Sequence, residues 1–214
     1  MEAVNLTNVE KIINGDTILS GVNITIKQGE IVGFEGRNGS GKSVLFKMIA
    51  GVMIPTNGEI AVFDEVLEKG RFPEDIGVSL DNTGFLPSLS AVDNLRTIAD
   101  VRGIIGLEEI KHYIELVGLN PASKKKVGKF SVGMKQRLAF AQAIMESPKL
   151  LLLDEPFSGL DEDGVILVRK LIKDMNEKDG VTVLITSHIK EDIEALCTRT
   201  FRVASGKVSL IPAS

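Results

Sequence analysis

The order of apolar and polar residues predicts short strands and helices along most of the chain. Five early segments show the alternating or continuous apolar pattern of a strand: residues 4–9, 17–26, 30–35, 59–63 and 76–80. Between the third and the fourth of these segments, residues 44–50 carry apolar side chains at helical spacing. This part of the chain is therefore expected to be mostly strand, with one helix.

The middle of the chain, from about residue 91 to 145, has helical patterns and little strand signal. Helices are expected over residues 91–101, over 107–117 and from 131 to 143 or 145, with Ser90 and Ser131 as N-caps. After residue 148 the alternation returns, with strands over 150–153 and 181–186, helices over 161–176 and 189–196, and a hairpin formed by 201–203 and 208–210. Alternating strands and helices indicate an α/β fold with a parallel sheet covered on both faces, into which the middle block is inserted.

Composition limits the class of protein. The 214 residues are 43% hydrophobic and 25% charged, which is typical of one soluble globular domain or a core with a small subdomain. The net charge of −4 argues against non-specific binding of nucleic acid over the whole surface. The N-terminus lacks a signal-peptide pattern, and no apolar run approaches the roughly 20 residues that span a bilayer. The single cysteine, Cys197, cannot form an internal disulfide and is expected to be a small apolar residue on a helix.

A glycine-rich loop with the pattern G-x-x-x-x-G-K-S lies at residues 36–43, between the strand over 30–35 and the helix over 44–50. Its glycines permit backbone angles that turn successive N–H groups onto a phosphate, and the helix N-terminus adds a partial positive charge. Lys42 is expected to reach the β- and γ-phosphates, and the Ser43 hydroxyl to bind Mg²⁺. The candidate nucleotide-binding residues are Gly36, Arg37, Asn38, Gly39, Ser40, Gly41, Lys42, Ser43 and Val44. The alternative is an ordinary glycine-rich turn.

A second candidate site follows the four leucines of residues 150–153, which predict a strand buried on both faces. Asp154 emerges at the carboxyl end of this strand, where α/β sheets bind ligands, and can hold Mg²⁺. Glu155 is the candidate for polarising the attacking water, because a carboxylate beside the γ-phosphate can accept its proton. The alternative is a solvated acidic pair at a strand end.

His188 leaves the end of the strand over 181–186 in a similar way. It could donate a hydrogen bond to the γ-phosphate, or position Glu155 and the water; the alternative is an ordinary surface histidine. His112 lies on a predicted helix without such a context and is interpreted as a surface residue.

Residues 130–137, Phe-Ser-Val-Gly-Met-Lys-Gln-Arg, resemble the signature motif of ABC ATPases, usually written L-S-G-G-Q. The resemblance covers almost the whole chain, because the glycine loop, the signature, the acidic strand, a D-loop-like segment at residues 158–161 and His188 follow in the family's order. It implies that Ser131 and Gly133 complete the nucleotide site of a second copy in a head-to-tail homodimer with two ATP at the interface. Asp161 would contact the opposite subunit. The alternative for Ser131 is a helix cap without ligand contact.

Several positions depart from the family pattern. Val132 replaces the first signature glycine and Met134 the glutamine, as in bacterial drug, bacitracin and lantibiotic-type exporters. Asp81 lies where the family has the Q-loop glutamine, and its carboxylate can still bind Mg²⁺. Ile13 falls near the aromatic residue that stacks on adenine in the family, so adenine is expected to be held by apolar packing with weak base selectivity.

The resemblance predicts the ATP-hydrolysing subunit of an ABC transporter, with ATP and Mg²⁺ bound, that powers a separate integral membrane permease, in the direction of export. The fold would be a P-loop NTPase core with a mostly parallel sheet, an N-terminal antiparallel β portion and a helical subdomain. These would form one domain over residues 1–214, with a catalytic core of 1–87 and 148–214 and the helical subdomain at 88–147. The chain would be cytoplasmic and peripheral on the inner face of the cell membrane through the permease.

A basic run precedes the signature and consists of Lys124, Lys125, Lys126 and Lys129. It is either a solvated face or a contact with the permease or lipid headgroups.

Two alternatives to transport stay open at this point. The first is an ABC ATPase that acts on DNA or the ribosome, against which stand the single cassette, the absence of a long insertion and the negative net charge. The second is a regulatory cassette that binds ATP without hydrolysing it, against which stand Glu155 and His188.

Overall fold

The computed structural model describes residues 1–80 and 84–212. Its centre is a six-stranded sheet with the spatial order β10-β9-β3-β8-β7-β6. All neighbouring strands are parallel except the terminal hairpin of β9 and β10. The strands are β3 (Ile31–Glu35), β6 (Ile76–Ser79), β7 (Leu150–Asp154), β8 (Thr182–Ser187), β9 (Arg199–Ala204) and β10 (Lys207–Leu210).

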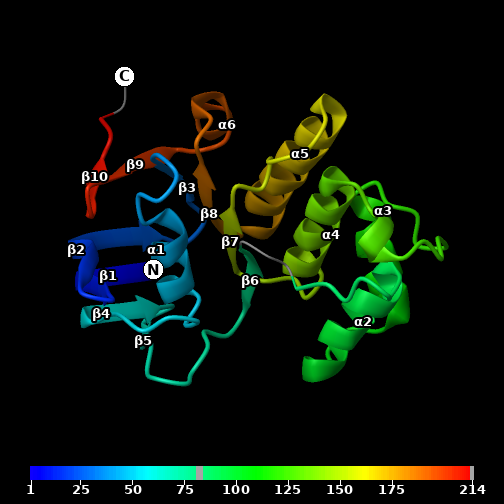
Figure 1. Cartoon of the computed structure of the whole chain (residues 1–214), viewed down its shortest axis with the longest axis horizontal. Coiled ribbons are helices and arrows are strands. Elements are labelled where there is room, and N and C mark those ends of the chain that lie inside the picture. The colour runs from blue at the N-terminus through cyan, green and yellow to red at the C-terminus, as the bar shows by residue number, and fades with distance from the viewer. Residues whose placement is uncertain (81–83, 213–214) are drawn as a thin grey trace.

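A second, antiparallel sheet is formed mainly by the N-terminal part of the chain and lies at the left of Figure 1. Its spatial order is β2-β1-β4-β5. The strands are β1 (Glu2–Ile13), β2 (Asp16–Lys27), β4 (Asn57–Val62) and β5 (Glu65–Val66). Helix α1 (Lys42–Ile49) lies between this sheet and the central sheet (Figure 1).

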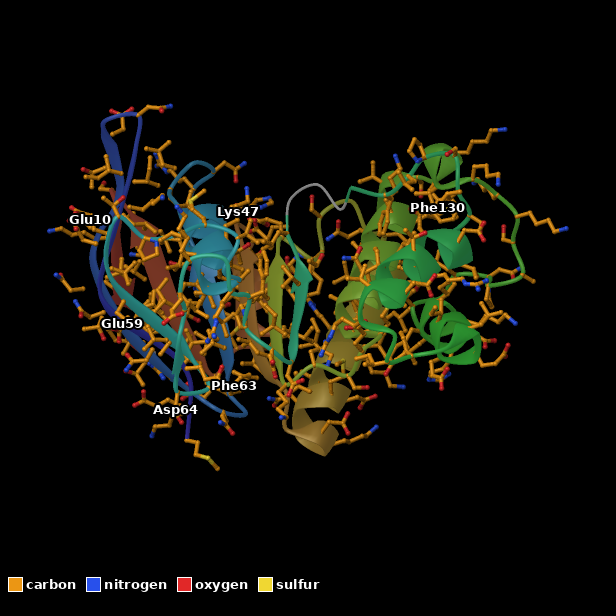
Figure 2. All side chains as sticks on the ribbon, turned by 90° about the horizontal axis from the view of Figure 1, so that it is seen from below. Glu10, Lys47, Glu59, Phe63, Asp64 and Phe130 are labelled. Carbon is orange, nitrogen blue, oxygen red and sulfur yellow. The ribbon has the colours of Figure 1, made fainter. Side chains whose placement is uncertain are left out.

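The other helices lie on the opposite side of the central sheet. They are α2 (Ala91–Arg102), α3 (Leu107–Leu116), the 3-10 turn η1 (Val127–Lys129), α4 (Val132–Ile144), α5 (Glu162–Asp179) and α6 (Lys190–Glu194). In Figure 2, Phe130 marks the helical part on one side of the molecule, and Glu10 and Glu59 mark the antiparallel sheet on the other. No helix among the described residues is both long enough and apolar enough to cross a bilayer.

The central sheet divides the interior into two apolar cores, because successive side chains of a strand point to opposite faces. On β7, Leu150 and Leu152 pack with α1 and the antiparallel sheet, whereas Leu151 and Leu153 pack with α4, α5 and the other helices. All four leucines are fully buried. A strand with two buried faces is therefore fixed in register, and this holds its carboxyl end, Asp154, in place.

The predicted α/β fold with a mostly parallel sheet, an N-terminal antiparallel portion and a helical block is confirmed. Helices α2, α3 and α4 fall within residues 88–147, and these subdomain boundaries stay a prediction. Some predicted bounds are wrong: α5 continues to Asp179, where Gly180 adopts the left-handed conformation that ends it, and α6 is shorter than residues 189–196. The short elements β5 and η1 were not predicted, because two or three residues show no period.

Candidate nucleotide-binding and hydrolysis site

The glycine loop joins the end of β3 to the start of α1 and passes close to other backbone segments. A side chain at Gly36 would place its Cβ 2.4 Å from the carbonyl oxygen of Val203. Gly41, the N-cap of α1, has φ +107°, and its Cβ would lie 3.1 Å from the side chain of Leu19. Both positions therefore require glycine, which leaves the backbone N–H groups at the helix start accessible to an anion.

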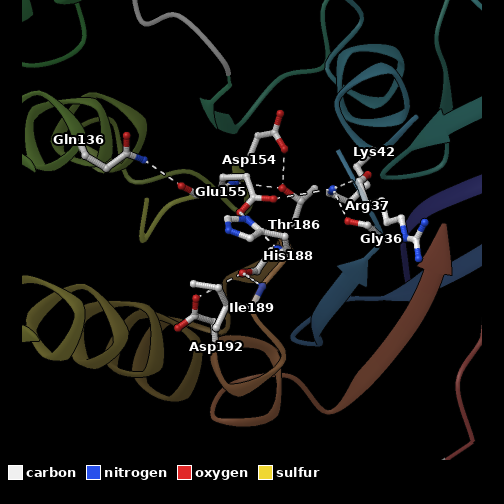
Figure 3. Close-up of polar contacts among 11 residues, drawn as sticks. Gly36, Arg37, Lys42, Gln136, Asp154, Glu155, Thr186, His188, Ile189 and Asp192 are labelled. Carbon is white, nitrogen blue, oxygen red and sulfur yellow. Dashed lines mark hydrogen bonds and ion pairs between the residues drawn. The ribbon is translucent and has the colours of Figure 1, made fainter. Parts of the chain in front are cut away.

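Lys42 begins α1 and is only 5% exposed. Its Nζ donates hydrogen bonds to the carbonyl oxygens of Gly36 at 2.8 Å and Arg37 at 3.3 Å, and it lies 3.7 Å from Oε1 of Glu155 (Figure 3). A buried ammonium group needs compensating oxygens, and here the loop itself and one carboxylate supply them. The same group can exchange these partners for phosphate oxygens.

Asp154 and Glu155 follow one another at the end of β7 and are oriented by Thr186 of the neighbouring strand β8. The Thr186 hydroxyl donates to Oδ1 of Asp154 and accepts the backbone N–H of Glu155 at 2.9 Å. Glu155 has φ +50°, a left-handed conformation that non-glycine residues rarely adopt. Such strain persists where the surroundings impose it, and it is frequent at functional sites.

His188 contacts the same carboxylate. Its Nδ1 lies 2.8 Å from Oε2 of Glu155, and its backbone N–H donates to that oxygen at 3.3 Å. Gln136 of α4 approaches from the other side and donates to the backbone carbonyl of Glu155 at 3.3 Å. Glu155 therefore lies between Lys42 and His188, as Figure 3 shows.

Two carboxylate oxygens of the site are buried and have no hydrogen-bond partner among the described residues: Oδ2 of Asp154 and Oε1 of Glu155. The described residues contain no cluster of three or more His, Cys, Asp or Glu side chains that could hold a metal by itself. Asp154 and Ser43 both line the same cavity and offer the hard oxygen ligands that Mg²⁺ prefers. The residues present therefore fit a Mg²⁺ that takes its remaining ligands from phosphate and water.

The cavity around these groups has a volume of about 680 Å³, which is in the range of ligand pockets. It brings together most of the predicted residues: Asn38, Gly39, Ser40, Gly41, Lys42, Ser43, Val44, Asp154, Glu155 and His188. Gly36 and Arg37 lie next to it in a separate hollow beside Arg202 and contribute through their carbonyl groups. Asp81 lies outside the described residues.

Ile13, which was predicted to hold adenine by apolar packing, is not among the residues that line this cavity. Ile13 is the last residue of β1 and pairs with Asp16 across the hairpin turn, whereas β2 then runs back past the glycine loop. Ile18 of β2 lines the cavity instead, and its carbonyl oxygen lies 3.3 Å from the Cβ that a side chain at Gly41 would have. Ile18 is therefore the apolar residue of this hairpin that lines the cavity, and the packing of Ile13 on adenine stays a prediction.

Ser131 and Gly133 do not line the cavity of their own chain. Ser131 is the N-cap of α4, its hydroxyl accepting the N–H of Met134 at 3.2 Å, and Gly133 makes room for the backbone of Gly159. Their neighbours on α4, Val132, Lys135 and Gln136, do line it, together with Leu80 and Ser158. The spacing of Val132, Lys135 and Gln136 could have predicted that they face the cavity together, since positions i, i+3 and i+4 share one face of a helix.

Comparisons with known proteins, by sequence and by structure, find similar proteins of one family. The sequence profile of the family described as "ABC transporter" matches residues 19–158. An uncharacterised ABC transporter ATP-binding protein, YybJ of Bacillus subtilis (strain 168), is 39% identical over 96% of this chain and 94% of its own length. The bacitracin transport ATP-binding protein BcrA of Bacillus licheniformis is 39% identical over 96% of this chain and 68% of its own length.

Among solved structures, the ATP-binding cassette MJ0796 is similar to this chain, with a TM-score of 0.87 and 25% identity over 99% of this chain and 100% of that one. It was solved as a dimer in a post-hydrolysis state bound to ADP and Pi.

Proposed function

This chain belongs to the ABC transporter family of ATP-binding proteins and is an ATPase; we propose that its cavity hydrolyses ATP with Lys42, Glu155 and His188 in separate roles. The observation that carries the proposal is the position of the Glu155 carboxylate between the Lys42 ammonium group and the His188 ring. Phosphoryl transfer needs mainly positioned charges and an oriented water molecule. These three side chains provide the charges and orient the water.

Lys42 holds the transferred phosphoryl group. Its ammonium group is bound to two loop carbonyls and lies 3.7 Å from Oε1 of Glu155, so it is already held in the cavity that ATP would enter. Phosphate oxygens are stronger acceptors than neutral carbonyls, and the N–H groups at the start of α1 add to the attraction. The triphosphate therefore displaces Lys42 from Glu155 and frees that carboxylate for water.

Glu155 accepts a proton from the attacking water through Oε1, the buried oxygen to which residues 1–80 and 84–212 offer no hydrogen-bond donor. His188 fixes the carboxylate through Oε2, so that the lone pairs of Oε1 keep one direction. Ser43 and Asp154 would hold Mg²⁺, which when bound neutralises phosphate charge. Asp81 is proposed as a further metal ligand.

Two copies of the chain would close around two ATP molecules, with Ser131 and Gly133 of each copy facing the glycine loop of the other. The support is that neither residue is among the described residues lining the cavity of its own chain, and that the similar cassette MJ0796 was solved as a dimer. Closing and reopening would move a separate membrane permease in the direction of export. The chain would then be cytoplasmic and bound to the inner face of the membrane through that permease. No nucleic-acid partner is proposed.

The test is the substitution Glu155→Gln, with Glu177→Gln as a control, since Glu177 is an exposed residue of α5 far from the chemistry. Removing a general base is expected to lower turnover roughly a hundredfold or more while ATP binding is kept. Phosphate release measures turnover, and light scattering with ATP and Mg²⁺ measures the dimer, which is expected to accumulate. Near-normal turnover of Glu155→Gln would remove Glu155 from its role.

A further inference from the structure

A buried ion pair lies directly behind the loop that carries His188. Asp192 of α6 is 5% exposed, and one of its carboxylate oxygens, Oδ1, accepts a hydrogen bond from Nη2 of Arg169 on α5. The other oxygen, Oδ2, accepts the hydroxyl of Ser187 at 3.2 Å. A carboxylate removed from water must be paired and hydrogen-bonded, and Asp192 satisfies this with one partner on each oxygen.

Ser187 connects this ion pair to His188. It is the last residue of β8, is 2% exposed, and precedes His188 in the chain. Its hydroxyl oxygen also accepts the backbone N–H of Ile189 at 3.0 Å (Figure 3). The residues on both sides of His188 are therefore attached to Asp192 through one hydroxyl group.

Arg169 connects the same pair to the segment that follows Glu155. The centre of its guanidinium group lies 5.6 Å from the centroid of the Phe157 ring, and Phe157 is 6% exposed. Nε of Arg169 is buried and finds no hydrogen-bond partner in the described segments. Within the described residues, Asp192 is the one carboxylate that forms an ion pair with Arg169, so the position of this side chain depends on Asp192.

His188 itself has little to hold it. Half of its side chain is exposed (51%), and its polar contacts within the part of the chain that the structure describes are the two hydrogen bonds to Oε2 of Glu155. An exposed side chain on a loop loses rotamer freedom when it is fixed, and this cost must be met by neighbouring contacts. The buried residues Asp192 and Ser187, with the half-buried Arg169 behind them, are the contacts that fix the loop.

We propose that Asp192 and Arg169 are positioning residues, which hold His188 in contact with Glu155 through the Ser187 hydroxyl and so control the rate of ATP hydrolysis. This inference rests on the proposed function of His188 and Glu155. Neither Asp192 nor Arg169 lines the nucleotide cavity, so their effect is expected on the hydrolysis step and not on ATP binding.

The two histidines of the chain make a direct test possible by NMR of their ring nitrogens, with His112 as an internal reference. The variants are Asp192→Asn and Ser187→Ala; the second removes a single oxygen atom and keeps the test valid if the first does not fold. Asp174→Asn is the matched control, because Asp174 forms an exposed ion pair with Lys178 on α5. Both variants are expected to shift the ring signals of His188 and leave those of His112, and the control to shift neither.

Turnover supplies the second readout. In both variants kcat is expected to fall roughly ten- to a hundredfold with KM for ATP nearly unchanged, as for a small displacement of a catalytic group. In a His188→Ala background, Asp192→Asn is expected to change kcat by less than about twofold, because residues that act through one another are not additive. If Asp192 only stabilised the fold, Asp192→Asn would lower kcat by the same factor in the His188→Ala background as in the wild type.

The inference and the proposed function fail separately. Unshifted His188 signals in folded Asp192→Asn and Ser187→Ala, or a full further loss of kcat in His188→Ala, would overturn the positioning role. Wild-type turnover of Glu155→Gln would overturn the function instead.

Discussion

Arg137 of α4 donates a hydrogen bond of 2.6 Å from Nη2 to Oδ1 of Asp161, the residue that caps α5. The same carboxylate oxygen accepts the backbone N–H of Gly164 at 3.1 Å. The bond from Arg137 and the bond from Gly164 lower the pKa of Asp161 below its ordinary value of 3.8. The signature helix is thus joined to the loop after β7 within one chain, and the contact of Asp161 with the opposite subunit stays a prediction.

The substitution Asp161→Asn tests this contact, because asparagine keeps the helix cap and removes the charge. A carboxylate with a lowered pKa contributes stability above the pKa of the unfolded chain and loses it as the pH falls through the folded pKa. The variant is therefore expected to melt at a lower temperature than the wild type at pH 7, and the difference is expected to decrease as the pH falls below 3.8 and to vanish once the pH is below the lowered pKa of Asp161 in the folded state. Thermal melts from pH 7 to pH 2.5 measure it, and a difference that does not depend on pH would contradict the prediction.

Lys42→Met is expected to weaken ATP binding roughly ten- to a hundredfold, because it removes a charged donor to phosphate without changing the length of the side chain much. Lys47→Met is the matched control: Lys47 lies on the same helix, α1, and does not line the cavity. Calorimetric titration with ATP measures both. Equal affinities of the two variants would show that Lys42 does not bind the nucleotide.

The sequence predicted the structure best where several neighbouring residues serve the same strand or the same binding site. Four consecutive leucines followed by Asp154 and Glu155 predicted a buried central strand with acidic residues at its end, and β7 has this structure. The order of the motifs predicted the family, the fold and the ATPase activity, which the comparisons confirm. Such patterns are local, so they can be read without knowing which segments meet in space.

Contacts between distant segments could not be predicted in this way. Thr186 orients both acidic residues from a neighbouring strand, and its position depends on the order of strands in the sheet. Ile18 replaces Ile13 in the cavity because of how the first hairpin folds against the glycine loop. The left-handed backbone at Glu155 has no sequence signal, since glutamate does not favour it.

The position of Ile18 leads to a prediction on nucleotide affinity. Ile18→Ala removes apolar surface from the cavity wall and is expected to cost about 1 kcal/mol of ATP binding, or roughly a fivefold rise in Kd. Ile13→Ala is the comparison variant, expected to raise Kd less than Ile18→Ala because Ile13 is not among the residues that line the cavity. Because apolar packing does not distinguish bases as hydrogen bonds do, GTP is expected to compete with ATP in a hydrolysis assay. Failure of GTP to compete, or an equal effect of the two alanine variants, would contradict this interpretation of the base site.

Cys197 lies in the connection between α6 and β9, not on a helix as predicted, and probes the packing of this connection on the central sheet. Its sulfur lies 3.0 Å from the Cβ that a side chain at Gly33 would have, so the thiol packs against β3. Burial raises the pKa of the Cys197 thiol from 9.0 to about 12. Because the thiolate is the reactive form, alkylation at pH 8 is expected to be roughly a thousandfold slower in the folded protein than in the unfolded chain.

The same shift gives a pH dependence of stability. A thiol with a raised pKa keeps its proton in the folded state, so the unfolded chain binds fewer protons once the pH passes 9.0. The free energy of unfolding is therefore expected to decrease between pH 9 and about 12 by more in the wild type than in Cys197→Ala, in which the thiol is absent. Denaturant melts of the two proteins at pH 8, 9.5 and 10.5 measure this difference. Parallel curves, together with rapid alkylation of the native protein, would mean that the thiol is open to water and that the segment between α6 and β9 does not pack closely on β3.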